Sequence, residues 1–165
     1  MARQKPCRDM GKRLEEKERR MDCNKRTVMK AIGCTRRAWL CHTKAIAMEL
    51  GIADSYREII VFLDRHPGAN QKNIAEFCNV TTAAVNQTLK DMLADGYVEK
   101  ETDEADRRYT KLFLTEKGRE MAVRIQDRIR VVDEKITETI SPEKAEEMIL
   151  LLDKIRDLLR EETEK

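Results

Sequence analysis

The sequence has few of the residues that all-β and membrane-spanning proteins need. Aromatic residues make up only 4% of its 165 positions, and there are six glycines and three prolines. A β-sandwich or barrel would need more aromatic and turn residues, so the composition favours a mainly helical fold. The longest unbroken apolar runs, 59–63 and 148–152, fall far short of the roughly 20 residues that span a bilayer. We therefore expect no membrane partner.

Groups that perform catalysis or bind metals are also scarce. There are two histidines and five widely spaced cysteines, with no CxxC pair, P-loop, glycine-rich dinucleotide turn or G-x-S-x-G motif. The sequence therefore predicts no enzyme, no cofactor and no metal site. Reduced thiols fit the odd cysteine count better than disulfides do, and the first residues lack the apolar core of a signal peptide. Both observations indicate a cytoplasmic protein.

Charge is what the sequence has in abundance. Charged residues make up 39% of the chain, yet the formal net charge is only +2. Residues 1–50 carry 14 basic and 6 acidic side chains, whereas residues 51–165 carry 19 and 25. Any basic field is therefore concentrated at the N-terminal end. Residues 1–24, which contain few apolar side chains, are expected to form a charged N-terminal arm outside the folded domain.

Apolar residues recur at helical spacing on both sides of a middle segment. They form two adjacent stripes over 28–48 and one stripe each over 121–140 and 145–159. The spacing predicts a long helix within 25–50 and two more within 115–165. These stripes exceed what a domain of about 65 residues can cover, so we expect the helices to pair with a second copy around a two-fold axis. They are the predicted dimerisation helices.

The middle segment, 51–114, contains the signals of a helix, a helix-turn-helix and a hairpin. Asn70, and then Thr81 or Thr82, are residues that cap helix starts. Two short β-type segments, YVEKE and YTKLFL, flank the polar stretch TDEADRR and predict a hairpin wing. The expected fold is mainly α with a small β-hairpin wing: a winged helix-turn-helix domain flanked by long dimerisation helices.

This pattern strongly resembles the MarR family of bacterial and archaeal transcriptional regulators. The resemblance runs without a gap from about Leu50 to Gly118, through LGIADSYREIIVFLDRHPG and NQKNIAEFCNVTTAAVNQTLKDMLADGYVEK. It continues in DEADRRYTKLFLTEKG, where an aspartate is followed two places later by an arginine and then by the L-T-E-K-G entry to a long helix. Two residues depart from the family: Arg57 replaces a usual aromatic, and Gln87 stands where many members carry arginine.

The resemblance implies a dimeric regulator, usually a repressor, that binds a pseudo-palindromic operator in double-stranded DNA. The predicted contacts from the second helix of the helix-turn-helix are Thr81, Thr82, Ala83, Asn86, Gln87 and Lys90. Asparagine and glutamine present a donor beside an acceptor, which suits the major-groove edge of adenine. In the wing, Arg107 and Arg108 are the predicted contacts, with Arg108 in the minor groove and Asp106 holding it in place.

The resemblance also implies a small effector, often aromatic or anionic, that binds between the dimerisation helices and the winged domain. The candidates to line its pocket are Trp39, His42, Ile46 and Tyr56. Trp39 and His42 are equally suited to be core residues. A thiol- or metal-responsive regulator is a further alternative, although only His42 accompanies Cys34 and Cys41 on the first long helix.

The charge of the winged segment supports a different class of function. Residues 51–114 contain 8 basic and 11 acidic side chains, a balance that is unfavourable for binding a polyanion. A winged helix that does not bind DNA and docks another protein through its basic arm is therefore the alternative. If the chain binds DNA, phosphate attraction depends on Lys90, Arg107, Arg108, Lys111 and the arm.

Overall fold

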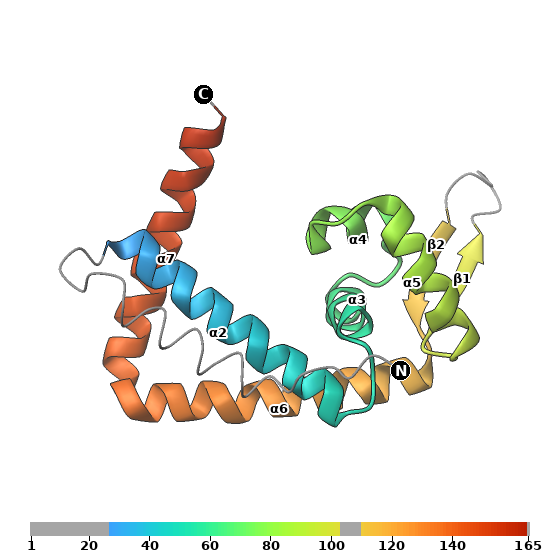
Figure 1. The fold of residues 1–165 in the computed structure, drawn as a ribbon, viewed down its shortest axis with the longest axis horizontal. Coiled ribbons are helices and arrows are strands. Elements are labelled where there is room, and N and C mark those ends of the chain that lie inside the picture. The colour runs from blue at the N-terminus through green and yellow to red at the C-terminus, as the bar shows by residue number, and fades with distance from the viewer. Residues whose placement is uncertain (1–26, 103–109, 165) are drawn as a thin grey trace, which may run out of the picture. The chain divides into compact units, whose positions relative to one another are not determined.

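The computed structural model describes residues 27–102 and 110–164, which form six helices and two strands (Figure 1). The elements are α2 (Val28–Glu49), α3 (Asp54–Arg65), α4 (Gln71–Cys78), α5 (Thr82–Ala94), β1 (Val98–Thr102), β2 (Thr110–Leu114), α6 (Glu116–Ile140) and α7 (Pro142–Thr163). The chain divides into two compact units, 1–125 and 126–165. The mainly α fold with a small β-hairpin is confirmed.

Capping side chains fix the two helices of the helix-turn-helix. Asn70 caps α4 in a reciprocal pair with Asn73, since each side chain accepts a hydrogen bond from the other residue's backbone amide. Asn79 ends α4 in the left-handed region, at φ 53°, which turns the chain toward α5. Thr81 caps α5, because its hydroxyl accepts a hydrogen bond from the Ala84 amide at 3.2 Å.

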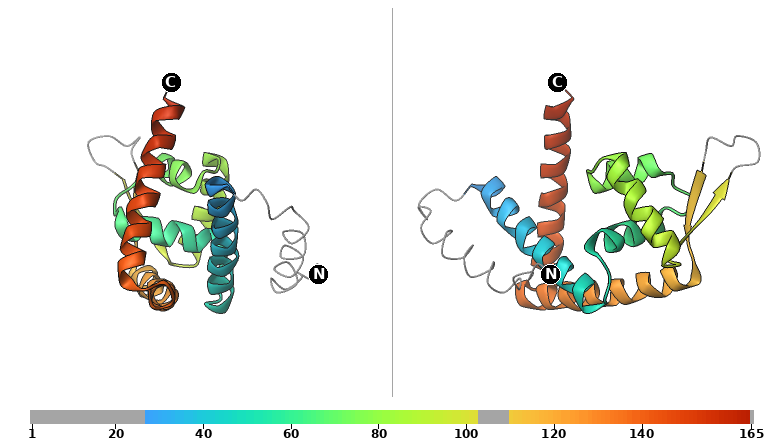
Figure 2. Two further views of the ribbon diagram at one scale, coloured as in Figure 1. Left: turned by 90° about the vertical axis from the view of Figure 1, so that its left-hand side faces the viewer. Right: turned by 45° about the vertical axis from the view of Figure 1, so that its right-hand side comes forward.

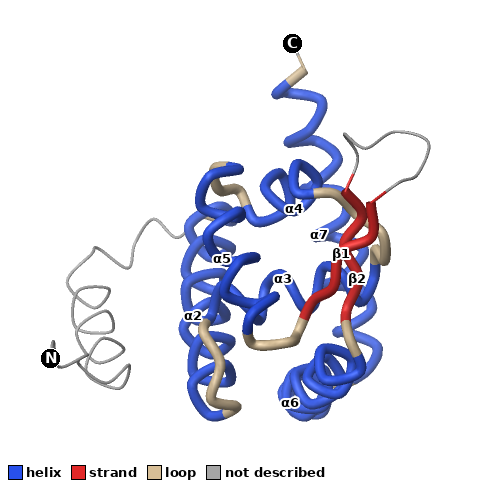
Figure 3. Tube along the Cα trace, turned by 90° about the vertical axis from the view of Figure 1, so that its right-hand side faces the viewer, coloured by secondary structure: helices blue, strands red, loops and turns tan. Residues whose placement is uncertain are grey.

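The core of the first unit lies among α3, α4, α5, the hairpin and the first half of α6. Figure 3 shows the backbone course of these elements. The most completely buried large side chains of this core include Ile60, Leu63, Ile74, Leu89, Met92, Leu112 and Ile125. The helix α5 directs Val85, Leu89 and Met92 inward, at positions i, i+4 and i+7. The opposite side of α5 is therefore left outside the core.

A single-residue bridge ties the hairpin to the segment between α3 and α4. β1 and β2 pair in antiparallel register over five residue pairs. On the other edge of β2, the Leu112 amide donates to the Ala69 carbonyl at 3.1 Å, and the Gly68 amide donates to the Leu112 carbonyl at 2.9 Å. The wing is thus held by the segment that precedes the helix-turn-helix.

The start of α6 is fixed on the turn between α5 and β1. The Thr115 hydroxyl accepts a hydrogen bond from the Gly118 amide at 3.1 Å and donates one to the Gly96 carbonyl at 2.7 Å. Gly118 is buried, and a Cβ atom at this position would overlap the Tyr97 carbonyl oxygen. The L-T-E-K-G sequence therefore serves to dock α6 closely against this turn.

The second unit leaves most of its apolar side chains exposed. Figure 2 shows α7 as one unbroken helix, and none of its residues is buried. Its exposed large hydrophobic side chains, with those of the second half of α6, are Val131, Ile136, Met148, Ile149, Leu150, Leu151, Leu152, Leu158 and Leu159. Apolar exposure on this scale marks an interaction surface.

Candidate nucleic-acid interface

The outward side of α5 brings together the six residues predicted from the sequence to contact DNA on this helix. Asn86 is half-buried, and the exposed ones are Thr81, Thr82, Ala83, Gln87 and Lys90. Ala83, Gln87 and Lys90 lie on the side opposite Val85, Leu89 and Met92, and Asn86 lies at its flank. Thr81 and Thr82 lie at the N-terminal end of the helix. We call these six residues the α5 polar face. Its first residue is the helix cap, so the free backbone amides of the α5 N-terminus lie beside it.

The α5 polar face adjoins an acidic residue that sequence reasoning missed. Asp91 is exposed, and its carboxylate accepts a hydrogen bond from Gln87 Nε2 at 3.3 Å. The signal for this pair was present in the sequence, because residues four apart lie on one side of a helix. Asp91 repels phosphate, whereas the neighbouring Lys90 attracts it.

The predicted wing contacts, Asp106, Arg107 and Arg108, lie outside the described residues. The strands that lead into and out of this segment carry charges of both signs. Glu101 of β1 and Lys111 of β2 are exposed and stand directly opposite one another in the hairpin register. The described part of the wing therefore provides no uniformly basic surface.

The four candidate effector residues fall in two places. Trp39 and His42 lie next to each other on α2, with ring centroids 6.1 Å apart, and Trp39 is 39% exposed. Within the single chain, α2 buries residues only from Thr43 onward, near its C-terminal end, so neither ring belongs to the core of the first unit. Ile46 belongs to this buried end. Tyr56, at the start of α3, lines a separate concavity that the other three do not line.

This concavity has a volume of about 390 Å³ and lies among α3, the C-terminal end of α5 and the first turn of α6. We call it the Tyr56 pocket, and its lining includes Ile52, Tyr56, Asp91, Asp95, Tyr97 and Lys117. The Tyr56 hydroxyl donates a hydrogen bond to Asp95 Oδ2 at 2.9 Å, and the Tyr97 ring meets the Tyr56 ring edge-on at 5.8 Å. Burial and the hydrogen bond to Asp95 raise the pKa of Tyr56 to about 12.

Arg57, the departure from the family pattern, is buried and paired. Its Nε lies 2.8 Å from Asp54 Oδ1, and its Nη2 lies 3.2 Å from Glu58 Oε1. An unpaired buried guanidinium would be strongly unfavourable, so these two carboxylates make the replacement of an aromatic side chain possible. The cap position of α3 is Ala53, and the Asp54 carboxylate faces Arg57.

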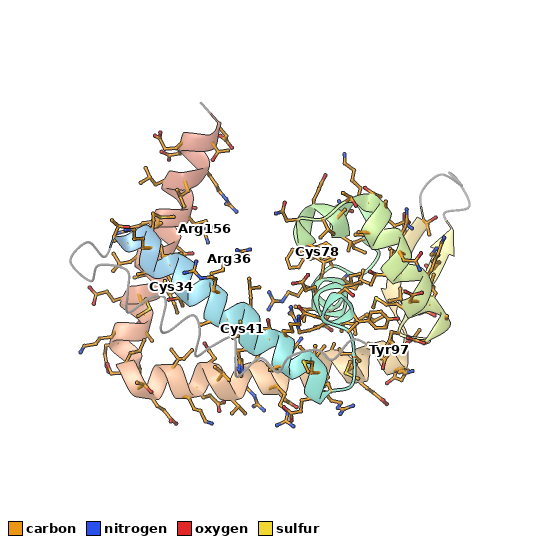
Figure 4. All side chains as sticks on the ribbon, in the orientation of Figure 1. Cys34, Arg36, Cys41, Cys78, Tyr97 and Arg156 are labelled. Atoms are coloured by element: carbon orange, nitrogen blue, oxygen red, sulfur yellow. The ribbon has the colours of Figure 1, made fainter. Side chains whose placement is uncertain are left out.

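Cysteines provide little support for a thiol or metal sensor. Burial, with a smaller contribution from the charge of Glu58, raises the pKa of the Cys78 thiol to about 11. Cys78 is therefore uncharged at neutral pH and a poor nucleophile. Cys34 and Cys41 lie along α2 (Figure 4), and Arg37 Nη2 lies 3.1 Å from Cys34 Sγ. Within residues 27–102 and 110–164, no three histidine, cysteine or acidic side chains are arranged to hold a metal ion.

The fold and the exposed α5 polar face together define a winged helix-turn-helix protein. The helix-turn-helix of α4 and α5 is followed by the hairpin, and a long helix leaves from the base of the wing. None of the helices in the described ranges is long and apolar enough to cross a membrane.

Comparisons with known proteins show which proteins the chain is similar to. Residues 50–108 match the MarR family. The chain is 23% identical over 105 residues to the HTH-type transcriptional regulator BilQ of Clostridium symbiosum, which covers 64% of this chain and 73% of BilQ. The transcriptional regulator SlyA shares the fold, with a TM-score of 0.71 at 19% identity over 83% of this chain and 96% of that one. Streptococcus pneumoniae FabT, solved in complex with DNA, has a TM-score of 0.60 at 25% identity over 67% of this chain and 77% of its own.

The winged segment of this chain, residues 50–108, therefore matches the MarR family of transcriptional regulators.

Proposed function

We propose that the protein is a homodimeric repressor that occupies a pseudo-palindromic DNA operator and responds to a small effector. The observation that carries the proposal is the α5 polar face, which stands outside the core of a MarR-family winged domain. A helix with such a face fits the major groove, where base edges are distinguishable. FabT, a structural neighbour, is known in complex with DNA.

Each group in the proposed interface has a separate task. Asn86 and Gln87 contact base edges, because their amides offer a donor and an acceptor together. Thr81 and Thr82 contact phosphates at the N-terminus of α5, where the helix dipole favours an anion. Arg108 enters the minor groove from the wing with Arg107 beside it and Asp106 in support, as the family resemblance implies.

Regulation follows from linkage between ligand and DNA. A two-fold dimer presents two copies of α5, and the distance between them decides whether both reach their half-sites. An effector that binds better to one arrangement shifts the population of dimers toward it. The exposed Trp39 and His42 rings on α2 suit an aromatic or anionic effector at that surface.

The function is tested by titrating the protein into labelled DNA from the region upstream of its own gene, with a shuffled duplex of equal composition. We expect binding to the upstream DNA at least tenfold tighter than to the shuffled duplex, as specific regulators show. Arg108→Ala should weaken this binding while leaving the thermal unfolding temperature unchanged.

The excess of acidic over basic residues in 51–114 favours the alternative, a protein-docking winged helix. Equal, weak binding to both duplexes would support that alternative.

A further inference from the structure

The side chains that line the Tyr56 pocket carry the opposite charge to those that a site for anions needs. Two carboxylates, Asp91 and Asp95, and one ammonium group, Lys117, line it, so its walls carry more negative than positive charge. We propose that the Tyr56 pocket binds a small organic cation, with a primary ammonium head group and an aromatic body. Its volume of about 390 Å³ lies within the range of small-molecule sites.

The protein's own Lys117 shows where an ammonium group fits. Lys117 Nζ donates a hydrogen bond to the Asp95 carbonyl at 2.6 Å and lies 4.3 Å from the centroid of the Tyr97 ring. A carbonyl oxygen and an aromatic face are two groups that favour a cation. Lys117 is exposed and its side chain is long and flexible, so the ammonium group of a ligand can displace that of Lys117.

The remaining walls suit the body of such a ligand. The rings of Tyr56 and Tyr97 pack edge to face at 5.8 Å, and Ile52 adds apolar surface. The Tyr56 hydroxyl donates to Asp95 Oδ2 and so holds this carboxylate at the pocket. The charges of Asp95 and Asp91 also contribute to the raised pKa of Tyr56, which is consistent with a negative potential inside the pocket. An anionic ligand would meet the same two carboxylates and be repelled.

Asp91 connects the pocket with the proposed DNA interface. Its carboxylate lines the pocket and also accepts the hydrogen bond from Gln87 Nε2 at 3.3 Å. A bound ammonium group competes with Gln87 for this carboxylate, which changes the orientation of the Gln87 amide. This coupling rests on the proposed function, because it acts on base recognition by Gln87. The predicted effect is a lower ratio of operator affinity to random-DNA affinity when the cation is bound.

Binding is tested first without DNA, by calorimetric titration of the full chain with phenethylammonium chloride at constant ionic strength. The neutral 2-phenylethanol and the anionic phenylacetate have similar bodies and serve as comparison ligands. Four variants are compared: Asp91→Asn, Asp95→Asn, Lys117→Met and, as an aspartate outside the pocket, Asp153→Asn. Thermal unfolding is measured for each variant to check that it is folded. If Asp95→Asn does not fold, Asp91→Asn alone tests the contribution of a pocket carboxylate.

We expect saturable binding of phenethylammonium only, weakened roughly tenfold by Asp91→Asn or Asp95→Asn through loss of a charge-assisted contact. Lys117→Met should strengthen binding several-fold, because it removes the competing ammonium group, and Asp153→Asn should change nothing. Equal binding of 2-phenylethanol, preferred binding of phenylacetate, weaker binding to Lys117→Met, or no saturable binding in the millimolar range would each overturn the site.

The coupling is tested by repeating the DNA titrations with saturating phenethylammonium. The ratio of operator affinity to random-DNA affinity should fall several-fold in the native protein and stay constant in Gln87→Ala. An unchanged ratio in the native protein would refute the coupling through Asp91. If the chain binds no operator at all, the proposed function fails, whereas the titration without DNA still decides whether the pocket binds a cation.

Discussion

Gly118 shows how a single absent Cβ atom sets the position of a long helix. A methyl group at this buried position would overlap the Tyr97 carbonyl oxygen, which belongs to rigid backbone. We expect Gly118→Ala to lower the free energy of unfolding by about 2 kcal/mol, since overpacking against backbone forces α6 away from the turn. Denaturant unfolding of both proteins measures the difference.

The matched control for this substitution is Gly33, a helical glycine of α2. A Cβ atom there would have only Arg37 Nη1 nearby, at 4.0 Å. Gly33→Ala should leave stability unchanged or raise it by up to about 1 kcal/mol, because alanine is the better helix former. A Gly118→Ala protein as stable as Gly33→Ala would show that the close contact with Tyr97 does not constrain α6.

At the scale of the residue, the sequence predicted which residues have a local role, but it did not predict which atoms they contact. It placed a cap at Thr81 or Thr82, and only the backbone geometry distinguishes Thr81, since both hydroxyls are chemically able to cap. It marked Arg57 as a departure but contained no signal that the buried guanidinium would pair with both Asp54 and Glu58. Such pairs depend on rotamers, which a pattern of residue types does not specify.

At the scale of the element, the proposed contacts of α5 divide into those that distinguish bases and those that hold phosphates. Asn86 and Gln87 are uncharged, so neither releases a counterion when DNA binds, whereas Lys90 does. Asn86→Ala or Gln87→Ala should lose roughly 1–3 kcal/mol of binding free energy at one operator position per half-site. The salt dependence of binding should stay almost the same as in the native protein. Lys90→Ala should weaken binding to all sequences alike and make the salt slope shallower by about one unit per protomer.

The measurement is a titration of each variant on the operator, on single-base variants and on random DNA at several salt concentrations. Thr139→Ala is a useful control, because Thr139 is exposed on α6, carries no charge and lies outside the α5 polar face. If Asn86→Ala and Gln87→Ala both keep the native base preferences, the assignment of α5 as the recognition helix is wrong, even for a protein that still binds DNA.

Most elements could be predicted from the sequence, because their apolar spacing and caps agree. The helix expected within 25–50 is α2, Val28–Glu49, and the two helices expected within 115–165 are α6 and α7. The bridge between Ala69 and Leu112 was not predicted, since a single paired residue has no periodicity. The Tyr56 pocket was missed for a related reason: its walls come from three elements that are distant in the sequence.

At the scale of the whole molecule, the exposed apolar side chains of α6 and α7 indicate a surface that binds a partner. The helix α7 has no buried residue, yet its leucines recur at helical spacing. Burial of apolar surface contributes about 25 cal/mol per Å², so a second copy that covers this stripe stabilises both chains. A two-fold arrangement satisfies both copies at once, because the same surface meets itself.

Dimerisation is therefore the prediction that belongs to this scale. Leu152, which is 44% exposed, and Ile155 lie one helical turn apart on α7. Replacing both with aspartate should shift the protein from dimer to monomer, because charges on an apolar interface are desolvated without partners. Sedimentation velocity at micromolar concentration measures the assembly, and Lys154→Asp, an exposed substitution on the same helix, is the control.

The predicted dimer also predicts the form of the proposed operator. Two copies of α5 related by a two-fold axis require each base contact to appear twice, in half-sites about one helical turn, roughly 10 base pairs, apart. Circular dichroism first checks that the Leu152→Asp/Ile155→Asp protein keeps its helices. The folded variant should lose the high affinity that comes from binding both half-sites and keep the weak affinity of a single winged domain. A native chain that sediments as a stable monomer, or a doubly substituted chain that remains dimeric, would show that α7 does not hold the two copies together.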